Sequence, residues 1–319
     1  MSISSLELKK LTAKFDSKLK EIISEDLPIL KKIKKHVIES GGKRIRPLTH
    51  YFLSQMLGYS GNSWADIGSI AELIHGASLL HDDVVDGAEL RRGVPTVGKL
   101  YGNKQAILGG DYLLACGIDH LNKFKNPELM SAFTSVIRDL SVGELIQMEW
   151  EKSPKITRKI YEKVIYGKTA SLFGAAALTA GILAETSGRQ KEILKEFGIN
   201  MGMLFQMKDD YIDYFEKKDK SGKIPLKDFQ NGLYTYPVIL LLEKTPKKEQ
   251  SAVHEIISKK EKKSEDEKRI LDLMKERGIE KESLESMKGT AVKLVNFLKS
   301  FPESKIRELM ITRIEELVE

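Results

Sequence analysis

Cysteine, proline and long apolar runs are all scarce in this chain of 319 residues. The single cysteine, Cys116, cannot form an internal disulfide and has no cysteine or histidine at metal-ligand spacing, which favours a small buried side chain in a reducing compartment. The nine prolines fall mostly between apolar segments, so long helices are permitted. The longest apolar stretch, 172–184, is too short to span a bilayer, and the first residues lack the pattern of a signal peptide. We expect a cytoplasmic protein with no transmembrane segment.

The charge balance favours anionic partners without identifying them. The net charge is +6 and the pI is about 9.0. The lysine-rich runs 31–36 and 259–268 lack interleaved aromatic residues, so we interpret them as solvated helix faces and expect no nucleic acid partner. With 41% hydrophobic and 31% charged residues, the chain has the composition of a globular protein, and we predict one domain over 1–319.

Helical periodicity extends over nearly the whole chain. Between short breaks, apolar residues recur at intervals of three and four, as in "ADIGSIAELIHGASLLH" and "GINMGMLFQMKDDYIDYF". No sustained alternation typical of a strand is present. The spacing therefore predicts an all-α fold of about ten or more helices. The segment 172–184, rich in glycine and alanine, is predicted to be a helix buried on most sides.

Two aspartate triads stand at the polar ends of apolar helical segments. They occur in "LLHDDVVD" (79–86) and "QMKDDYIDY" (206–214), and their members are Asp82, Asp83, Asp86, Asp209, Asp210 and Asp213. Like charges four residues apart destabilise a helix, so a cation is expected to offset them. One such motif commonly marks an exposed helix end, whereas two indicate facing helices. Because Mg²⁺ combines a few carboxylates with phosphate oxygens, the pair predicts a magnesium-dependent diphosphate site.

Basic residues occur in matching stretches. "GGKRIRP" (41–47), "ELRRGVPT" (89–96), "GKTASLFG" and "SGKIP" supply Lys43, Arg44, Arg46, Arg91, Arg92, Lys168 and Lys223. Arginine suits fork-shaped phosphate contacts, and lysine supplies a point charge. Six aspartates, these cations and an apolar helical body together predict a substrate with a charged head and an apolar tail.

These motifs closely resemble those of the trans-prenyl diphosphate synthases. The resemblance continues through "GGDYLLA", "GELIQME" and "FLKSFPESKIRELM" and covers most of the chain in the family's order. It implies a helical bundle around a deep central apolar cavity. The resemblance also implies a homodimer. Its implied activity is the addition of isopentenyl diphosphate to an allylic diphosphate, here farnesyl or geranylgeranyl diphosphate, in the trans configuration. Because the implied product is apolar, the enzyme is also expected to make peripheral contact with a membrane when it releases that product.

The resemblance also implies a role for each matching residue. The six aspartates hold two or three Mg²⁺ ions on the allylic diphosphate, assisted by Arg91, Lys168 and Lys223. Isopentenyl diphosphate binds to a second set, Lys43, Arg46, His75 and Arg92. Thr169 and Gln206 face the allylic cation that forms when the diphosphate leaves. The isopentenyl double bond attacks that cation, and a proton is lost to the departing diphosphate.

The stretch "GKIPLKDFQNGLYTYP" departs from the family pattern. Leu233 replaces a common second lysine, Leu226 replaces a glycine, and Tyr236 replaces a leucine. One diphosphate contact is therefore expected to be missing, with Lys227 as a nearby candidate to replace it.

Three other readings compete with this one. His81 and Asp82 form the dyad of an HD-type metal phosphohydrolase, but that reading leaves the second triad and the arginines unexplained. A non-catalytic subunit of a heteromeric synthase is expected to lose part of a triad, and both are intact. A short-chain synthase, making farnesyl or geranylgeranyl diphosphate, differs only in product length.

Small residues precede the first triad, where the family sets product length. Ala77 and Ser78 stand five and four residues before Asp82, and Ile74 follows one turn deeper. A helical turn rises about 5.4 Å, comparable with one isoprene unit. Since no aromatic residue blocks growth on this helix, we predict a medium- or long-chain product, hexaprenyl to octaprenyl or beyond, for quinone side chains. Phe133 is our candidate for the floor of the cavity.

The length hypothesis is tested by replacing both small residues. The variant Ala77→Phe with Ser78→Phe is expected to shorten the product markedly, because two rings then occupy the path of the growing chain. Chromatographic sizing of the dephosphorylated prenols measures the change. An unchanged product length contradicts the hypothesis.

Overall fold

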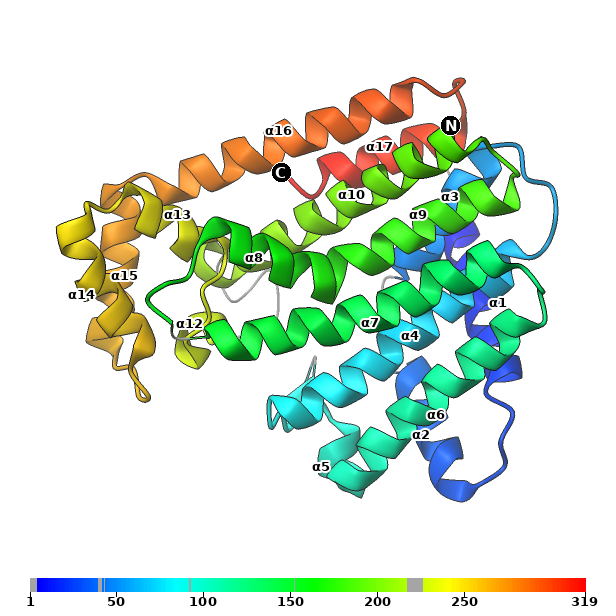
Figure 1. Ribbon diagram of the computed structural model, residues 1–319, viewed down its shortest axis with the longest axis horizontal. Coiled ribbons are helices and arrows are strands. Elements are labelled where there is room, and N and C mark those ends of the chain that lie inside the picture. The colour runs from blue at the N-terminus through cyan, green and yellow to red at the C-terminus, as the bar shows by residue number, and fades with distance from the viewer. Residues whose placement is uncertain (1–4, 40–41, 43, 92, 152, 217–225) are drawn as a thin grey trace. The chain divides into compact units, whose positions relative to one another are not determined.

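The computed structural model describes residues 5–39, 42, 44–91, 93–151, 153–216 and 226–319, and this part of the chain is almost entirely helical (Figure 1). Its helices are α1 (Ser5–Ile22), α2 (Pro28–Glu39), α3 (Ile45–Met56), α4 (Trp64–Val85), α5 (Val97–Tyr101), α6 (Asn103–Asn122), α7 (Pro127–Trp150), α8 (Arg158–Ile165), η1 (Tyr166–Ala170), α9 (Ser171–Leu183), α10 (Gly188–Phe215), α12 (Lys227–Asn231), α13 (Tyr236–Lys244), α14 (Lys247–Ser258), α15 (Ser264–Glu276), α16 (Ile279–Lys299) and α17 (Lys305–Glu315). The prediction of an all-α fold with ten or more helices is confirmed.

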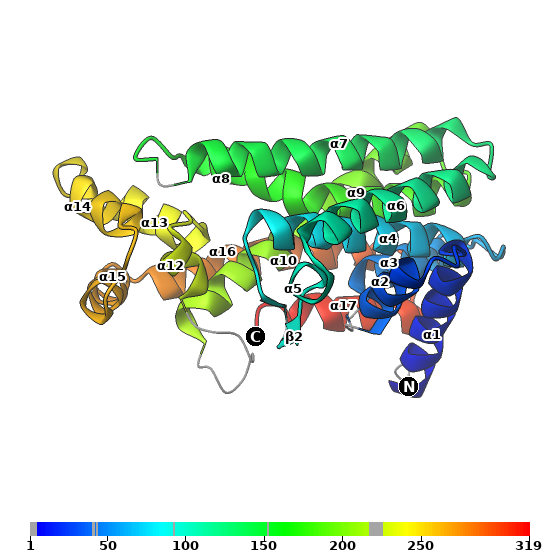
Figure 2. The same ribbon diagram turned by 90° about the horizontal axis from the view of Figure 1, so that it is seen from below.

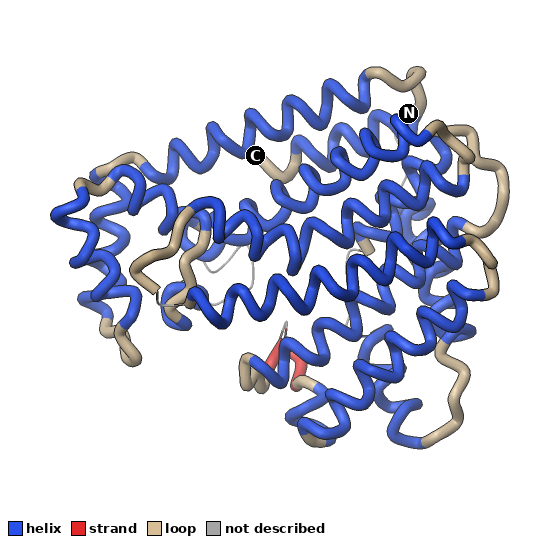
Figure 3. Tube along the Cα trace, in the orientation of Figure 1, coloured by secondary structure: helices blue, strands red, loops and turns tan. Residues whose placement is uncertain are grey.

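A short hairpin is the one piece of sheet among the described residues. Strands β1 (Leu90–Arg91) and β2 (Val94–Pro95) pair antiparallel, with Arg91 opposite Val94 (red in Figure 3). Two-residue strands are too short to produce a readable alternation, so the periodicity could not predict them.

The helices form two compact units, each assembled from segments that are far apart in the sequence. The first unit contains Met1–Ile137, Leu172–Gly198 and Lys299–Ile311, and the second contains Arg138–Ser171, Ile199–Leu298 and Thr312–Glu319. The first triad therefore belongs to the first unit, and the second triad belongs to the second.

Helix α4 is the centre of the first unit. It packs against α1, α3 and α6, and α6 runs alongside it (Figures 1 and 2). Most of its positions are buried, from Trp64 to Leu80, which agrees with its largely apolar sequence. The aspartate triad follows at the end of this buried stretch.

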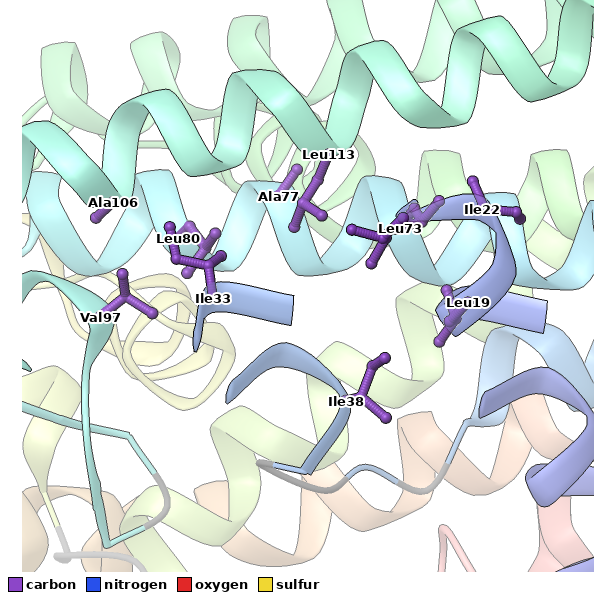
Figure 4. Close-up of a cluster of buried hydrophobic side chains, with 11 residues drawn as sticks. Leu19, Ile22, Ile33, Ile38, Leu73, Ala77, Leu80, Val97, Ala106 and Leu113 are labelled. Atoms are coloured by element: carbon purple, nitrogen blue, oxygen red, sulfur yellow. The ribbon is translucent and has the colours of Figure 1, made fainter. Parts of the chain in front are cut away.

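One face of α4 closes an apolar cluster with α1, α2, α5 and α6 (Figure 4). Its buried members are Leu19, Ile22, Ile23, Ile33, Ile38, Leu73, Ala77, Leu80, Val97, Ala106 and Leu113. Because such burial supplies the main driving force of folding, this cluster fixes the position of α4 within the unit.

Helix α9 is also buried, as predicted from its small apolar residues. Phe173, Ala176 and Ala177 are fully enclosed. His50 on α3 ties the two helices together, because its Nδ1 lies 3.0 Å from the carbonyl oxygen of Ala176 and 3.1 Å from Thr179 Oγ1. Burial lowers the pKa of His50 to about 4, so the ring is neutral at physiological pH.

The second unit has its own apolar interior around α13. This helix packs against α8 and α15, and α14 packs against α15. All residues from Tyr236 to Leu242 are buried, and Pro237 stands in the first turn, where its fixed φ suits the start of a helix. Among the helices of the described residues, none combines the length and the apolar character needed to cross a membrane.

The buried neutral His50 predicts a dependence of stability on pH. Its folded pKa of about 4 lies below the ordinary 6.5, so between these values the unfolded chain binds a proton that the folded chain does not. The free energy of unfolding should therefore fall as the pH drops from about 6.5 to about 4, by about 3 kcal/mol from this group. Urea unfolding at several pH values measures the slope.

His50→Asn is the control for this effect. Its amide nitrogen can still donate to Ala176 but does not titrate. The variant should lose the part of the slope that corresponds to one proton. Parallel curves for the two proteins would rule out His50 as the source.

Candidate functional site

The first triad lies at the carboxyl end of α4, where acidic residues are least favoured. The helix macrodipole places partial negative charge at this end, so carboxylates here need compensation. Asp83 is only 6% exposed, whereas Asp82 is half-buried and Asp86 is exposed. Burial raises the pKa of Asp83, and the neighbouring charge of Arg91 opposes that rise.

Arg91 supplies the compensating charge from the β1–β2 hairpin. Its Nε donates to Asp83 Oδ1 over 2.7 Å. The hairpin is held by Thr96, whose buried hydroxyl donates to the carbonyl of Ala88 at 2.8 Å and accepts from the backbone nitrogen of Lys99 at 3.2 Å. Arg91 is therefore paired with the buried aspartate of the first triad in the folded chain.

His36 is a neighbour of this triad that the motifs did not reveal. It is half-buried on α2, and burial lowers its pKa while the charge of Asp83 raises it. No signal in the sequence could have identified it, because it stands outside every motif that carries the family resemblance.

Two of the predicted isopentenyl diphosphate residues lie in the first unit's described part. The guanidinium of Arg46 stacks 4.7 Å from the centre of the Phe173 ring, and His75 lies half-buried on α4. Lys43 and Arg92 of the same set, and Lys223 of the other set, lie outside the described residues.

The length-determining candidates occupy different environments. Ala77 is fully buried in the cluster with α2 and α6, and Ile74 and Phe133 are also fully buried. Ser78 is only half-buried, and its hydroxyl donates to the carbonyl of His75 at 2.9 Å. Phenylalanine at position 77 would have to displace core side chains, so Ser78→Phe alone is the form of the length test that leaves the cluster intact.

The middle residue of the second triad is bound on both oxygens by protein donors. Asp210 Oδ1 accepts from Gln206 Nε2 at 2.9 Å, and Oδ2 accepts from the Tyr161 hydroxyl at 2.7 Å and the Tyr236 backbone nitrogen at 3.0 Å. Burial raises the pKa of Asp210 to about 6, and these hydrogen bonds oppose the rise. This aspartate therefore joins α8, α10 and the start of α13.

The last residue of the second triad binds the start of α12. Asp213 is buried, and its two carboxylate oxygens accept from the backbone nitrogens of Lys227 at 3.0 Å and Asp228 at 3.1 Å. It thereby satisfies free backbone donors at the start of α12. Asp209 is more exposed than Asp210 and Asp213, as Asp82 and Asp86 are more exposed than Asp83.

A π-helical turn carries Lys168 and Thr169. This turn, η1, interrupts the α-helical chain between α8 and α9, a feature frequent at functional sites. Lys168 forms an ion pair with Glu144, and Thr169 Oγ1 donates to Gln206 Oε1 at 2.8 Å. Thr169, Gln206, Asp210 and Tyr161 therefore form one continuous hydrogen-bonded chain.

The three departures from the family pattern take defined positions. Leu226 is buried and adopts a left-handed conformation with φ 58°, which glycine would adopt without strain. Tyr236 is buried, with its ring 6.0 Å from that of Tyr161 and 5.7 Å from the guanidinium of Arg158. Leu233 is half-buried and donates its backbone NH to the carbonyl of Asp228.

The donor chemistry fits a metal that is shared with a phosphorylated ligand. Within the described ranges, no three carboxylate, histidine or cysteine side chains are grouped to hold a metal ion by themselves. Mg²⁺ typically takes one or two carboxylates together with waters and phosphate oxygens, and the aspartates of the triads are carboxylates of this kind. His81 instead contacts α6, with Nε2 3.1 Å from the carbonyl of Ile107, so the described geometry gives the HD-type alternative no support.

The sequence matches known proteins over most of its length. The polyprenyl synthetase family matches residues 27–274. Octaprenyl diphosphate synthase of Escherichia coli (strain K12) is 33% identical over 219 residues, covering 69% of this chain and 68% of that protein. Short chain isoprenyl diphosphate synthase of Methanothermobacter thermautotrophicus is 32% identical over 255 residues, covering 78% of each. The structure of a decaprenyl diphosphate synthase from Rhodobacter capsulatus superposes with a TM-score of 0.91 at 30% identity, covering 98% of this chain and 97% of that one.

The close approach of two glycines predicts which substitution disturbs the π-helical turn. A Cβ on Gly167 would lie 2.6 Å from the carbonyl oxygen of Asp139 and 2.7 Å from the Cα of Gly143, and these are backbone atoms that cannot yield easily. Gly167→Ala should therefore lower the free energy of unfolding by about 1–3 kcal/mol. Chemical denaturation measures it.

Gly289→Ala on α16 is the matched control. Its Cβ would meet no atom within 4 Å, so the helical propensity of alanine should raise stability by up to about 1 kcal/mol. Equal stability of the two variants would show that η1 does not require a glycine at position 167.

Proposed function

Because the chain belongs to the polyprenyl synthetase family and is therefore a prenyltransferase, we propose that it is a trans-polyprenyl diphosphate synthase. It adds isopentenyl diphosphate units in sequence to an allylic diphosphate such as farnesyl or geranylgeranyl diphosphate. The observation that carries the proposal is the shared design of the two triads. In each triad the middle aspartate is buried and bound by protein donors. The more exposed carboxylates are Asp82 and Asp86 in the first triad and Asp209 in the second.

The more exposed aspartates are the residues we propose for the cofactor. Asp82, Asp86 and Asp209 would hold two or three Mg²⁺ ions together with the allylic diphosphate. When bound, Mg²⁺ supplies Lewis-acid stabilisation to the departing diphosphate. Asp83, Asp210 and Asp213 complete the six ligands predicted from the motifs, and each of them also accepts hydrogen bonds from protein donors.

The remaining residues bind and orient the reactants. Lys168 and Arg91 stabilise the diphosphate as the allylic C–O bond breaks and its electron pair leaves on oxygen. Thr169 and Gln206, held together by their hydrogen bond, present oxygen atoms toward the allylic cation. The isopentenyl double bond then supplies the electron pair of the new C–C bond. Loss of a proton to the released diphosphate restores a double bond.

Isopentenyl diphosphate binds at Arg46 and His75, assisted by Lys43 and Arg92. Because this substrate keeps its diphosphate, its site needs cations without a metal, and a bidentate arginine suits that task. The stacking of Arg46 on Phe173 supports a fixed guanidinium orientation.

The product is proposed to be of medium or long chain length. Small residues at positions 77 and 78 support this length, as do the octaprenyl and decaprenyl synthases among the relatives. A short-chain product is the second candidate, favoured by the similarity to a short chain isoprenyl diphosphate synthase.

We further propose that the product is used in quinone side chains. We also propose that the enzyme is cytoplasmic, that it makes peripheral contact with a membrane, and that it forms a homodimer. The exposed Ile107 and Leu108 on α6 support the last of these.

Activity is tested by incubating the purified protein with Mg²⁺, labelled isopentenyl diphosphate and farnesyl diphosphate. We expect prenols of hexaprenyl length or longer, and no product after chelation of the metal.

Asp82→Asn should reduce the rate on the order of a hundredfold or more, because charge stabilisation of the leaving group is lost. Asp119→Asn, a surface carboxylate on α6, should leave the rate unchanged.

Each outcome of this assay has a distinct meaning. Products that stop at geranylgeranyl length keep the enzyme class and favour the short-chain candidate. No product from the intact protein contradicts the synthase proposal and favours a non-catalytic subunit.

A further inference from the structure

Arg44 belongs to the basic motif "GGKRIRP", yet its side chain is turned into the protein. The residue is 6% exposed and precedes α3. Its backbone is left-handed, with φ 47° and ψ 38°, which is unusual for a long side chain. Such a conformation persists where surrounding contacts determine it strongly.

Three groups from three helices hold the Arg44 guanidinium. Nη1 donates to Glu72 Oε1 on α4 at 2.6 Å, Nη2 lies 2.9 Å from Asp16 Oδ1 on α1, and Nη2 also donates to the carbonyl of Ile38 on α2 at 3.0 Å. Glu72 is itself buried, at 7% exposed. All of these residues lie within the first unit.

The contact with Glu72 links two parts of the chain that carry predicted substrate residues. Arg46 follows Arg44 by two residues in the first turn of α3, and His75 follows Glu72 by three residues on α4. A short buried ion pair between Arg44 and Glu72 therefore fixes the start of α3 against the stretch of α4 that bears His75.

We propose that the Arg44–Glu72 ion pair is a positioning pair for isopentenyl diphosphate, setting the spacing between Arg46 and His75. This inference rests on the proposed function, because it assigns isopentenyl diphosphate to those two residues. Neither Arg44 nor Glu72 touches the substrate. They act by holding the two binding groups at the separation that one diphosphate requires.

A purely structural role makes a different prediction. The contacts with Asp16 and Ile38 tie Arg44 to α1 and α2, which carry none of the proposed substrate residues. If Arg44 served stability alone, loss of the Asp16 contact and loss of the Glu72 contact would affect substrate binding equally. If the pair positions substrate groups, only loss of the Glu72 contact should change it.

The test compares Glu72→Gln with Asp16→Asn in the full-length protein. Each variant removes the negative charge of one carboxylate that contacts the Arg44 guanidinium, with little change in side-chain shape. Glu72→Gln should raise the KM for isopentenyl diphosphate about tenfold, the scale of one weakened charged hydrogen bond, and leave the KM for farnesyl diphosphate unchanged. Asp16→Asn should lower the unfolding midpoint without moving either KM. Arg307→Lys is the control for an arginine held elsewhere in the first unit, by the Phe301 carbonyl and the exposed Glu308, and it should leave both KM values unchanged.

Arg44→Lys keeps the proposal testable should Glu72→Gln fail to fold. Lysine retains the charge but cannot hold Glu72, Asp16 and Ile38 together with a planar fork, so a smaller rise in the KM for isopentenyl diphosphate is expected. Equal shifts in both KM values, or none, in an active protein would overturn the positioning role. An intact protein that condenses no substrate would refute the proposed function and this inference with it.

Discussion

Compensation of buried charge is the constraint on which the architecture around the candidate site depends. A carboxylate or guanidinium removed from water must find partners inside the protein. Asp83 pairs with Arg91, Asp210 accepts hydrogen bonds from three donors, and Arg44 pairs with Glu72. Apart from the bond between Gln206 and Asp210 within α10, these contacts join different elements, so the bonds that compensate buried charge also position the site residues. The more exposed aspartates, Asp82, Asp86 and Asp209, lie nearer to water, where a ligand could approach them.

The sequence predicted the helical class and the residue types of the site, because both depend on local spacing. Apolar residues at intervals of three and four identify a helix whatever it packs against, and repeated aspartates identify an affinity for cations. The partners of charged residues could not be predicted in the same way. Arg44 and Glu72 stand 28 residues apart, and nothing in "GGKRIRP" distinguishes the arginine that turns inward from the one expected to meet a phosphate. Likewise, the motif "DDYID" does not indicate that Asp210 is enclosed.

Left-handed backbone occurs at two positions within the motifs that carry the predicted substrate residues. Arg44 and Leu226 are two of the four non-glycine residues with positive φ in the described chain, and each lies within one of these motifs. At position 226 the family resemblance leads us to expect glycine, and here a buried leucine adopts the left-handed conformation. At position 236 the resemblance leads us to expect leucine, and here the tyrosine ring lies 6.0 Å from that of Tyr161 while its backbone nitrogen donates to Asp210.

The interleaving of the two units in sequence bears on how the protein is made. The first unit includes Lys299–Ile311, so a ribosome must translate almost the whole chain before that unit can acquire all of its segments. Domains that are continuous in sequence can fold as they emerge, at a synthesis rate of about 5–20 residues per second. Here the surfaces of the first unit that await Lys299–Ile311 stay uncovered until almost all of the chain has been made. Because transiently exposed apolar surface favours aggregation, we expect this late segment to influence expression yield.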